Sequence, residues 1–207
     1  MPKNGQARQG TTRTFIEEAR RRQIVEAAID VITEQGYAGA SLERIALKAG
    51  ISRGLISYHF AGRDDLMAAV VTTVFTEAAA FMKPRMEAAS SPTELLHEYL
   101  RGSLEYMRDH RAQLVSVVEI STGGSRGELR SGRSEIARGV GVLEQILRAG
   151  QRTGEFRPFD PHVMAVTMRT AVDNVPRQMA LNPHLDLDAW AAELVDLFTR
   201  AVRGGGS

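Results

Sequence analysis

The sequence predicts an all-α protein of about nine helices, with a small N-terminal head and a larger C-terminal body. Apolar residues recur three and four positions apart along most of the 207 residues, which is the spacing of one helix face. Capping Ser and Asp residues and glycine stops divide this pattern into separate helices. No segment shows a convincing strand pattern. We therefore expect helices packed on helices throughout.

The composition is that of a globular protein with a full hydrophobic core. Hydrophobic residues make up 43% of the chain and charged residues 25%. The absence of Cys excludes disulfides, thiol nucleophiles and Cys-ligated metals. No stretch approaches about 18 consecutive apolar residues, and the N-terminus lacks the apolar core of a signal peptide. We expect a cytoplasmic protein without a membrane span.

The net charge of +1 does not by itself indicate a nucleic-acid partner, but its distribution does. Residues 1–63 carry 10 Lys and Arg against 6 Asp and Glu, whereas the remainder carries 16 against 19. A basic head on a mildly acidic body favours a protein that contacts DNA with one end. A charge asymmetry without function remains the alternative.

The N-terminal part is expected to comprise a flexible arm, residues 1–15, and a three-helix DNA-binding domain, residues 16–63. The arm is polar, and its basic residues Lys3, Arg8 and Arg13 would be able to reach the DNA backbone or minor groove. A solvated tail without such contacts is the alternative interpretation.

Two short helices joined by a tight turn lie between Ser41 and Arg63. Ser41 is placed to cap the first helix, which ends at Gly50, and Ser52 is placed to cap the second. This order is typical of the helix-turn-helix motif, whose second helix enters the major groove of DNA. An ordinary helical hairpin would show the same local pattern.

The wider context RRQIVEAAIDVITEQGYAGASLERIALKAGISRGLISYHFAGRDDL closely resembles the DNA-binding head of the TetR (tetracycline-repressor) family of bacterial transcription regulators. The resemblance is specific from about Arg20 to Leu66 and only architectural beyond. Ala40, Ser57 and Arg63 stand where the family often has Thr, Tyr and Lys. The first two departures remove possible phosphate contacts, and the third keeps the charge as a fork. The residues expected to contact DNA are Ser41, Ser52, Arg53, Gly54, Ser57, Tyr58, His59 and Arg63.

The body, residues 64–207, is expected to bind the effector and to form the dimer. Its six helices are predicted at about 64–86, 91–109, 111–120, 135–151, 160–181 and 188–202. Residues 121–134 are expected to form a long loop. Its glycines do not predict a phosphate cradle, because no strand precedes it and the Gly-Lys-Ser/Thr ending is missing. Pro84 and Pro176 predict a stop or kink in their helices.

The family resemblance implies an effector cavity in the body. Asp173 and Asn174 interrupt an otherwise apolar helix close to Pro176, which favours an apolar ligand with one donor or cationic group. The alternative is that Asp173 pairs with Arg169 one turn back and is structural. The expected lining residues are Phe75, Phe81, Met82, Tyr99, Tyr106, Met107, Asp173 and Asn174.

The resemblance also implies a homodimer in which the last two helices of each copy form a four-helix bundle. The nearly all-apolar helix at 160–181 gives an independent reason, because it needs cover on more than one side. The expected interface residues are Val163, Val166, Trp190, Leu194 and Phe198.

Nothing in the sequence predicts a metal, a cofactor or a catalytic residue. The five histidines form no His-x-x-x-His or His-Glu-x-x-His pair, and no Gly-x-Ser-x-Gly motif exists. We therefore expect a homodimeric regulator, a repressor released from a palindromic operator by a small molecule, and no enzyme. Two alternatives stay open: a DNA-architectural protein without an effector, and an all-helical enzyme that uses Asp173.

Overall fold

The computed structural model describes residues 6–123 and 126–203, and side chains from Phe15 onward except at 126–136. The described residues form nine α-helices and no strand, which confirms the all-α fold. The helices are α1 (Gln6–Gly39), α2 (Leu42–Ala49), α3 (Arg53–His59), α4 (Arg63–Ala88), α5 (Pro92–Asp109), α6 (Arg111–Gly123), α7 (Arg126–Thr153), α8 (Pro161–Leu181) and α9 (Leu187–Val202).

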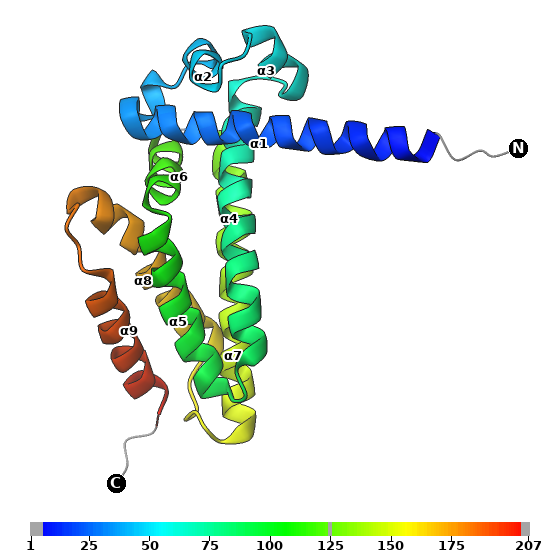
Figure 1. Ribbon diagram of the computed structural model, residues 1–207. Helices are drawn as coiled ribbons and strands as arrows, with labels where there is room; N and C mark the ends of the chain where they lie inside the picture. The colour runs from blue at the N-terminus through cyan, green and yellow to red at the C-terminus, as the bar shows by residue number, and fades with distance from the viewer. Residues whose placement is uncertain (1–5, 124–125, 204–207) are drawn as a thin grey trace, which may run out of the picture.

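The head consists of α1, α2 and α3 and sits at one end of the elongated body (Figure 1). α1 lies across the end of the body, with α2 and α3 on its far side, and α4 leads from α3 down into the body. Ile24, Ile45 and Ile56 contribute one side chain from each helix to the core of the head, and all three are fully buried. These residues belong to one apolar core that continues from the head into the body.

α4 is the central helix of the body. It is long and apolar enough to cross a membrane, a test that the core helix of a soluble protein also passes. It packs against α1, α5, α6 and α7, and it buries Leu66, Met67, Val70, Val71 and Val74 among them. The packing identifies α4 as a core helix of this fold.

Tyr37 lies at the joint between head and body. Gly36 has a φ of 72°, a conformation that glycine adopts without strain, and it bends the end of α1. The N–H of Tyr37 donates to Glu119 of α6 at 3.4 Å. From α4, the Arg63 guanidinium stacks on the Tyr37 ring at 3.9 Å and donates to the carbonyl oxygens of Tyr37 and Ala40. Both α4 and α6 therefore bind the C-terminal end of α1 through side-chain contacts.

The helix bounds differ from expectation at two places. The backbone of α1 is helical from Gln6, where a flexible arm was predicted, and residues 1–5 with Lys3 lie outside the described range. α7 begins at Arg126, so most of the predicted loop at 121–134 is helical. Each internal glycine costs only about 1 kcal/mol relative to Ala, so it weakens a helix without ending it.

The two prolines also lie inside continuous helices. Pro84 lies within the last two turns of α4, and Pro176 is buried in the second half of α8. Proline removes one backbone donor, and packing against neighbouring helices offsets that loss.

Candidate DNA-binding surface and effector cavity

The two short helices of the head begin at the serine caps that the sequence predicted. The Ser41 hydroxyl accepts from the N–H of Arg44 at 3.3 Å, and the Ser52 hydroxyl accepts from the N–H of Leu55 at 3.2 Å. Gly50 closes α2 with a φ of 66°, in the left-handed region that glycine adopts without strain. Two short capped helices joined by the tight turn at Gly50 are the arrangement of a helix-turn-helix.

α3 turns its apolar side inward and its polar side to solvent. Ile56 is fully buried, whereas Arg53, Gly54 and Ser57 are exposed, and Tyr58 is 66% exposed. The rings of Tyr58 and His59 are nearly perpendicular, with their centroids 5.0 Å apart. The exposed residues form a continuous surface that could enter a DNA groove.

Arg53 is already paired within the head. Its guanidinium lies 2.6 Å from a carboxylate oxygen of Glu43 on α2, and both side chains are exposed. The pKa of Glu43 is lowered, chiefly by a backbone N–H at the start of α2 and further by Arg53. Arg53 must therefore leave Glu43, or share it, before it contacts a base.

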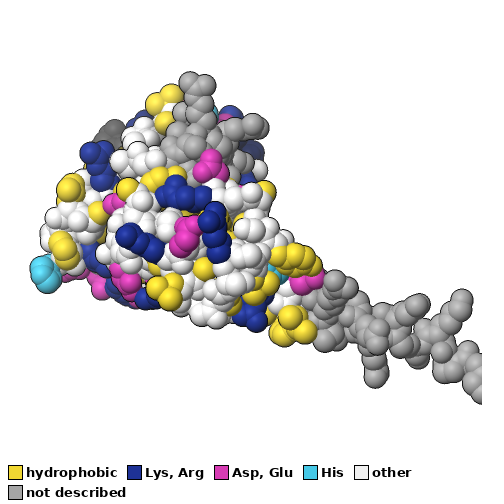
Figure 2. All heavy atoms as spheres, turned by 90° about the horizontal axis from the view of Figure 1, so that it is seen from above, with side chains coloured by type: hydrophobic (Ala, Val, Ile, Leu, Met, Phe, Trp, Pro, Cys, Tyr) yellow, Lys and Arg dark blue, Asp and Glu magenta, His cyan; other side chains and the backbone are white. Residues whose placement is uncertain are grey.

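Two features of this surface were missed by sequence reasoning. Leu47 is 82% exposed, one turn from Glu43 on the same face of α2. Arg21, which belongs to the Arg20–Arg22 run, stacks on Phe60 at 4.2 Å and donates to the carbonyl of His59. Figure 2, which looks onto the head, shows basic side chains with acidic and apolar ones among them.

Arg63 is the expected DNA contact whose placement differs most from expectation. Its donors are used on the carbonyl oxygens at the end of α1, and its guanidinium plane rests on Tyr37. In this conformation it joins head to body and does not extend toward a phosphate. The fork that distinguishes Arg from Lys serves these carbonyl oxygens.

The body contains a cavity of about 560 Å³ between α4, α5, α6, α7 and α8. Most of its wall is apolar, and a few polar groups converge on it, which is typical of a small-molecule site. Its described lining residues are Val74, Phe75, Thr76, Ala78, Ala79, Met82, Lys83, Met86, Tyr99, Ser103, Tyr106, Met107, Leu114, Arg138, Gly139, Val142, Arg169 and Val172.

The expected effector residues are divided by the structure. Phe75, Met82, Tyr99, Tyr106 and Met107 line the cavity. The other three expected residues are absent from the described lining. Phe81 packs beside the cavity, with its ring centroid 5.5 Å from that of Tyr106. Asp173 pairs with Arg169, and Asn174 is exposed on α8. The polar wall residues that the expected effector set lacked are Thr76, Lys83, Ser103, Arg138 and Arg169.

A buried polar cluster lies where α5, α7 and α8 meet. Arg169 forms a two-pronged ion pair with Asp173 one turn later, at 2.7 and 2.9 Å, and its Nη1 donates to the Tyr99 hydroxyl at 2.8 Å. Burial raises the pKa of Asp173, an effect that Arg169 opposes. Asp173 thus pairs with Arg169, as the alternative to a ligand contact proposed. Arg169 in turn holds the Tyr99 hydroxyl at the cavity wall.

Gly139 of α7 makes room for this cluster. A Cβ atom there would lie 2.5 Å from Nη1 of Arg169. Gly139 thus allows a close approach of α7 to α8 that a side chain would block, whereas a Cβ at Gly141 would meet nothing within 4 Å.

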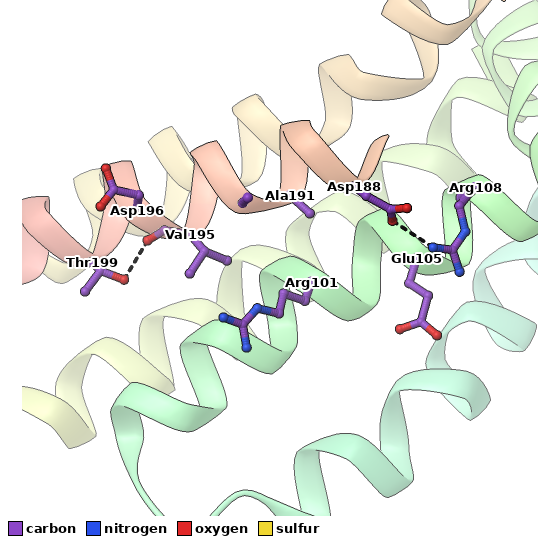
Figure 3. A pocket seen from close by; sticks show the side chains of 9 residues that line it. Arg101, Glu105, Arg108, Asp188, Ala191, Val195, Asp196 and Thr199 are labelled. Atoms are coloured by element: carbon purple, nitrogen blue, oxygen red, sulfur yellow. Dashed lines mark hydrogen bonds and ion pairs between the residues drawn. The ribbon is translucent and has the colours of Figure 1, made fainter. Parts of the chain in front are cut away.

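A second hollow of about 540 Å³ lies between α5 and α9 (Figure 3). Most of its charged side chains are paired within the protein: Arg108 contacts Asp188 at 2.7 Å, Glu105 contacts Arg85 at 2.8 Å, and Asp196 contacts Arg200 at 2.9 Å. Beside this hollow, His97 shares a hydrogen bond of 2.8 Å with Thr199. The Arg108–Asp188 and His97–Thr199 contacts fasten α9 to α5, and the apolar cavity is the better ligand site.

The expected dimer residues also occupy two different environments. Val163 and Val166 are 61% and 41% exposed on α8, where a partner could cover them. Trp190 and Leu194 are partly buried against the core, and Phe198 is only 5% exposed. Phe198 thus packs inside its own chain, because α9 turns that face to α5. Leu197, 57% exposed, lies on the free side of α9 and was missed.

Comparison with known proteins gives matches over the head and over the whole fold. Residues 24–70 match the model of bacterial regulatory proteins of the tetR family. HTH-type transcriptional regulator BetI 1 of Chromohalobacter salexigens is 32% identical over 87 residues, which span 42% of this chain and 43% of that protein. The fatty acid metabolism regulator protein of Bacillus subtilis is 27% identical over 87% of this chain and 94% of its own.

Solved structures share the complete fold. A bacterial regulatory protein in the tetR family from Rhodococcus RHA1 superimposes with a TM-score of 0.77 at 21% identity, over 90% of this chain and 98% of that one. The transcriptional regulator FadR from Bacillus subtilis, solved in complex with stearoyl-CoA, gives a TM-score of 0.79 at 19% identity, over 88% and 99%. At these identities the likeness concerns the fold.

Proposed function

The chain belongs to the tetR family of bacterial regulatory proteins, and we propose that it is a homodimeric repressor released from its operator when a small molecule fills the α4–α8 cavity. One observation carries the proposal. The same chain has an exposed helix-turn-helix surface at one end and a walled, mostly apolar cavity in its body. Because a bacterial regulator must reach its operator DNA, we place the protein in the cytoplasm.

The DNA interface we propose is the exposed side of α3 together with its caps. Arg53 lies in the first turn of α3, where such helices meet base edges, and Arg pairs bidentately with guanine. Tyr58 and Ser57 extend the same surface. Glu43 holds Arg53 until DNA is bound.

The dimer interface we propose is the exposed side of α8 and α9. Val163, Val166 and Leu181 on α8 and Leu197 on α9 are apolar and exposed. Isolated exposed apolar residues are ordinary, but several on the last two helices favour a partner that covers them. A two-fold axis there would present two copies of α3 to two half-sites.

The release mechanism we propose is a population shift. α4 begins at the joint with the head, where Arg63 stacks on Tyr37, and then supplies much of the cavity wall. α8 supplies Arg169 to the same wall and carries the exposed apolar face outside. An effector that binds better when the two heads are wrongly spaced would lower operator affinity.

Selection of bound DNA from a random pool tests the first half of the proposal. A palindromic site is the expected result, and binding without sequence preference would instead support an architectural protein. Arg53→Ala should relax the preference at one position per half-site, at a cost of about 1–3 kcal/mol for that base. Uniform weakening at every position would make Arg53 a phosphate contact.

Sedimentation of the variant Leu197→Glu tests the dimer. A charge buried in an apolar interface should give monomers that bind the full operator weakly. Asp196→Lys, at a neighbouring exposed position, controls for a change of surface charge. A fully dimeric Leu197→Glu protein would move the interface elsewhere.

Turnover of a bound ligand would favour the enzyme alternative.

A further inference from the structure

We propose that the effector is an acyl compound whose acyl oxygen accepts a hydrogen bond from the Tyr99 hydroxyl inside the α4–α8 cavity. This inference rests on the proposed function only for the cavity as the effector site. It concerns the chemistry of the ligand, which neither the fold nor the charge balance of the chain specifies.

The argument begins with the direction of one hydrogen bond. Arg169 Nη1 and the Tyr99 hydroxyl oxygen are 2.8 Å apart. A guanidinium has donors only, so the Tyr99 oxygen is the acceptor and its own proton must point elsewhere. Tyr99 lines the cavity with a side chain that is 6% exposed. Within the described residues, Tyr99 donates its hydroxyl proton to no other group.

Tyr106 provides a contrast on the same helix. It lines the same cavity, yet its hydroxyl donates to the carbonyl oxygen of Val74 at 3.2 Å. Its proton is used inside the protein, whereas that of Tyr99 is left for an acceptor in the cavity. A buried donor without a partner is costly, which favours a ligand that supplies one.

The Tyr99 hydroxyl is also held in place. Arg169, which fixes its oxygen, is itself fixed by the two-pronged pair with Asp173 and by contact with Gly139. Burial raises the pKa of Tyr99, so the phenol keeps its proton at neutral pH. The cavity therefore presents one oriented neutral donor in an apolar wall.

The charges of the wall disfavour a cationic ligand. Lys83, Arg138 and Arg169 line the cavity, and its described lining includes no carboxylate. Asp173, which the sequence suggested as a partner for a cationic group, is occupied by Arg169. The ligand that fits is an apolar body with an acceptor oxygen, which reverses the earlier expectation of a donor or cation.

Three probes with the same tail separate the possible head groups: methyl decanoate, decanoic acid and decylamine. Calorimetry of the purified wild-type protein should show binding of the ester or the acid, or both, and none of the amine, which is cationic at neutral pH. Preference for the amine, or no binding by either acyl probe, would overturn the proposal. This comparison needs no variant.

The variants Tyr99→Phe and Tyr106→Phe then test the donor itself. Each removes one hydroxyl from the same cavity, and each fold is checked by thermal unfolding. Tyr99→Phe should weaken binding of the acyl probe by about fivefold to tenfold, and by more than Tyr106→Phe, which removes a hydroxyl that already donates to Val74. Equal losses, or no loss in Tyr99→Phe, would overturn the role of Tyr99.

Operator binding by the ligand-free protein separates this inference from the proposed function. If the free protein binds a palindrome and an acyl probe neither binds nor releases it, the ligand chemistry is wrong and the regulator stands. If the free protein binds no DNA while an acyl probe still needs Tyr99, the regulator is wrong and the site stands.

Discussion

The DNA-binding surface of the head and the effector cavity of the body are built in opposite ways. The DNA-contacting set lies between Ser41 and Arg63, and its cap partners are three residues apart. Tyr99 and Arg169, the polar centre of the cavity, are separated by 70 residues and meet only through the packing of α5 on α8. The residues of a short motif can thus be recognised in the sequence, whereas residues that meet in a cavity cannot.

The largest expected effect concerns the body. Asp173→Ala should lower the free energy of unfolding by about 2–4 kcal/mol, because it leaves Arg169 with a buried charge and no carboxylate. Because Asp173 keeps 27% of its side chain exposed, we place the loss at the lower part of the usual range. Urea unfolding measures the loss.

The double variant Asp173→Ala with Arg169→Met is the control, since it removes both charges and should recover most of the stability. If Asp173→Ala unfolds like the wild type but is released poorly by effector, then Asp173 belongs to the ligand site after all.

A second prediction compares two glycines of α7. Gly139→Ala should destabilise the protein by about 1–2 kcal/mol, since its Cβ would lie 2.5 Å from Arg169 Nη1. Gly141→Ala should stabilise it by about 0.5–1 kcal/mol, because nothing lies within 4 Å and Ala favours helix. Thermal unfolding of both variants tests the packing of α7 on α8, and the same sign for both would contradict it.

A third prediction concerns the joint between head and body. Arg63→Ala should cost about 1 kcal/mol of stability, because it removes the bonds to the carbonyl oxygens of Ala40 and Tyr37 and the stacking on Tyr37. The salt dependence of DNA binding should change by less than about one unit of slope.

Arg63→Lys distinguishes the two roles of this residue. Lys keeps the charge but lacks the fork, so it should not restore stability. Normal stability in both variants, with a slope lowered by about one unit in Arg63→Ala alone, would return Arg63 to the phosphate contacts.

The smallest expected effect is a pH dependence at the α5–α9 contact. Burial, together with Arg101 and Arg203, lowers the pKa of His97 below its ordinary 6.5. The unfolded chain therefore binds a proton more readily, and stability should fall as the pH drops below about 6.5. Urea midpoints between pH 5 and 7 should slope less in His97→Gln, and an unchanged slope would assign the effect to other groups.

Near-neighbour chemistry made the head predictable. The caps of α2 and α3, the left-handed Gly50 and the inward Ile56 follow from residues within about four positions of one another. The same rules placed the starts of α5 and α8, at Ser91 and Asp160. Glycine stops were overestimated in α7, since a local helix penalty is small beside the packing of a long helix.

The sequence by itself determined most of the helices, their caps, the helix-turn-helix and the resemblance to the tetR family, because each depends on spacing along one segment. Only the tertiary structure decided which side of α9 is free, that Arg63 turns inward, and that Asp173 pairs with Arg169. Helical periodicity shows that a stripe is apolar without showing what covers it. A buried charge likewise takes whichever partner the packing brings near, and here Arg169 pairs with Asp173 and donates to the Tyr99 hydroxyl.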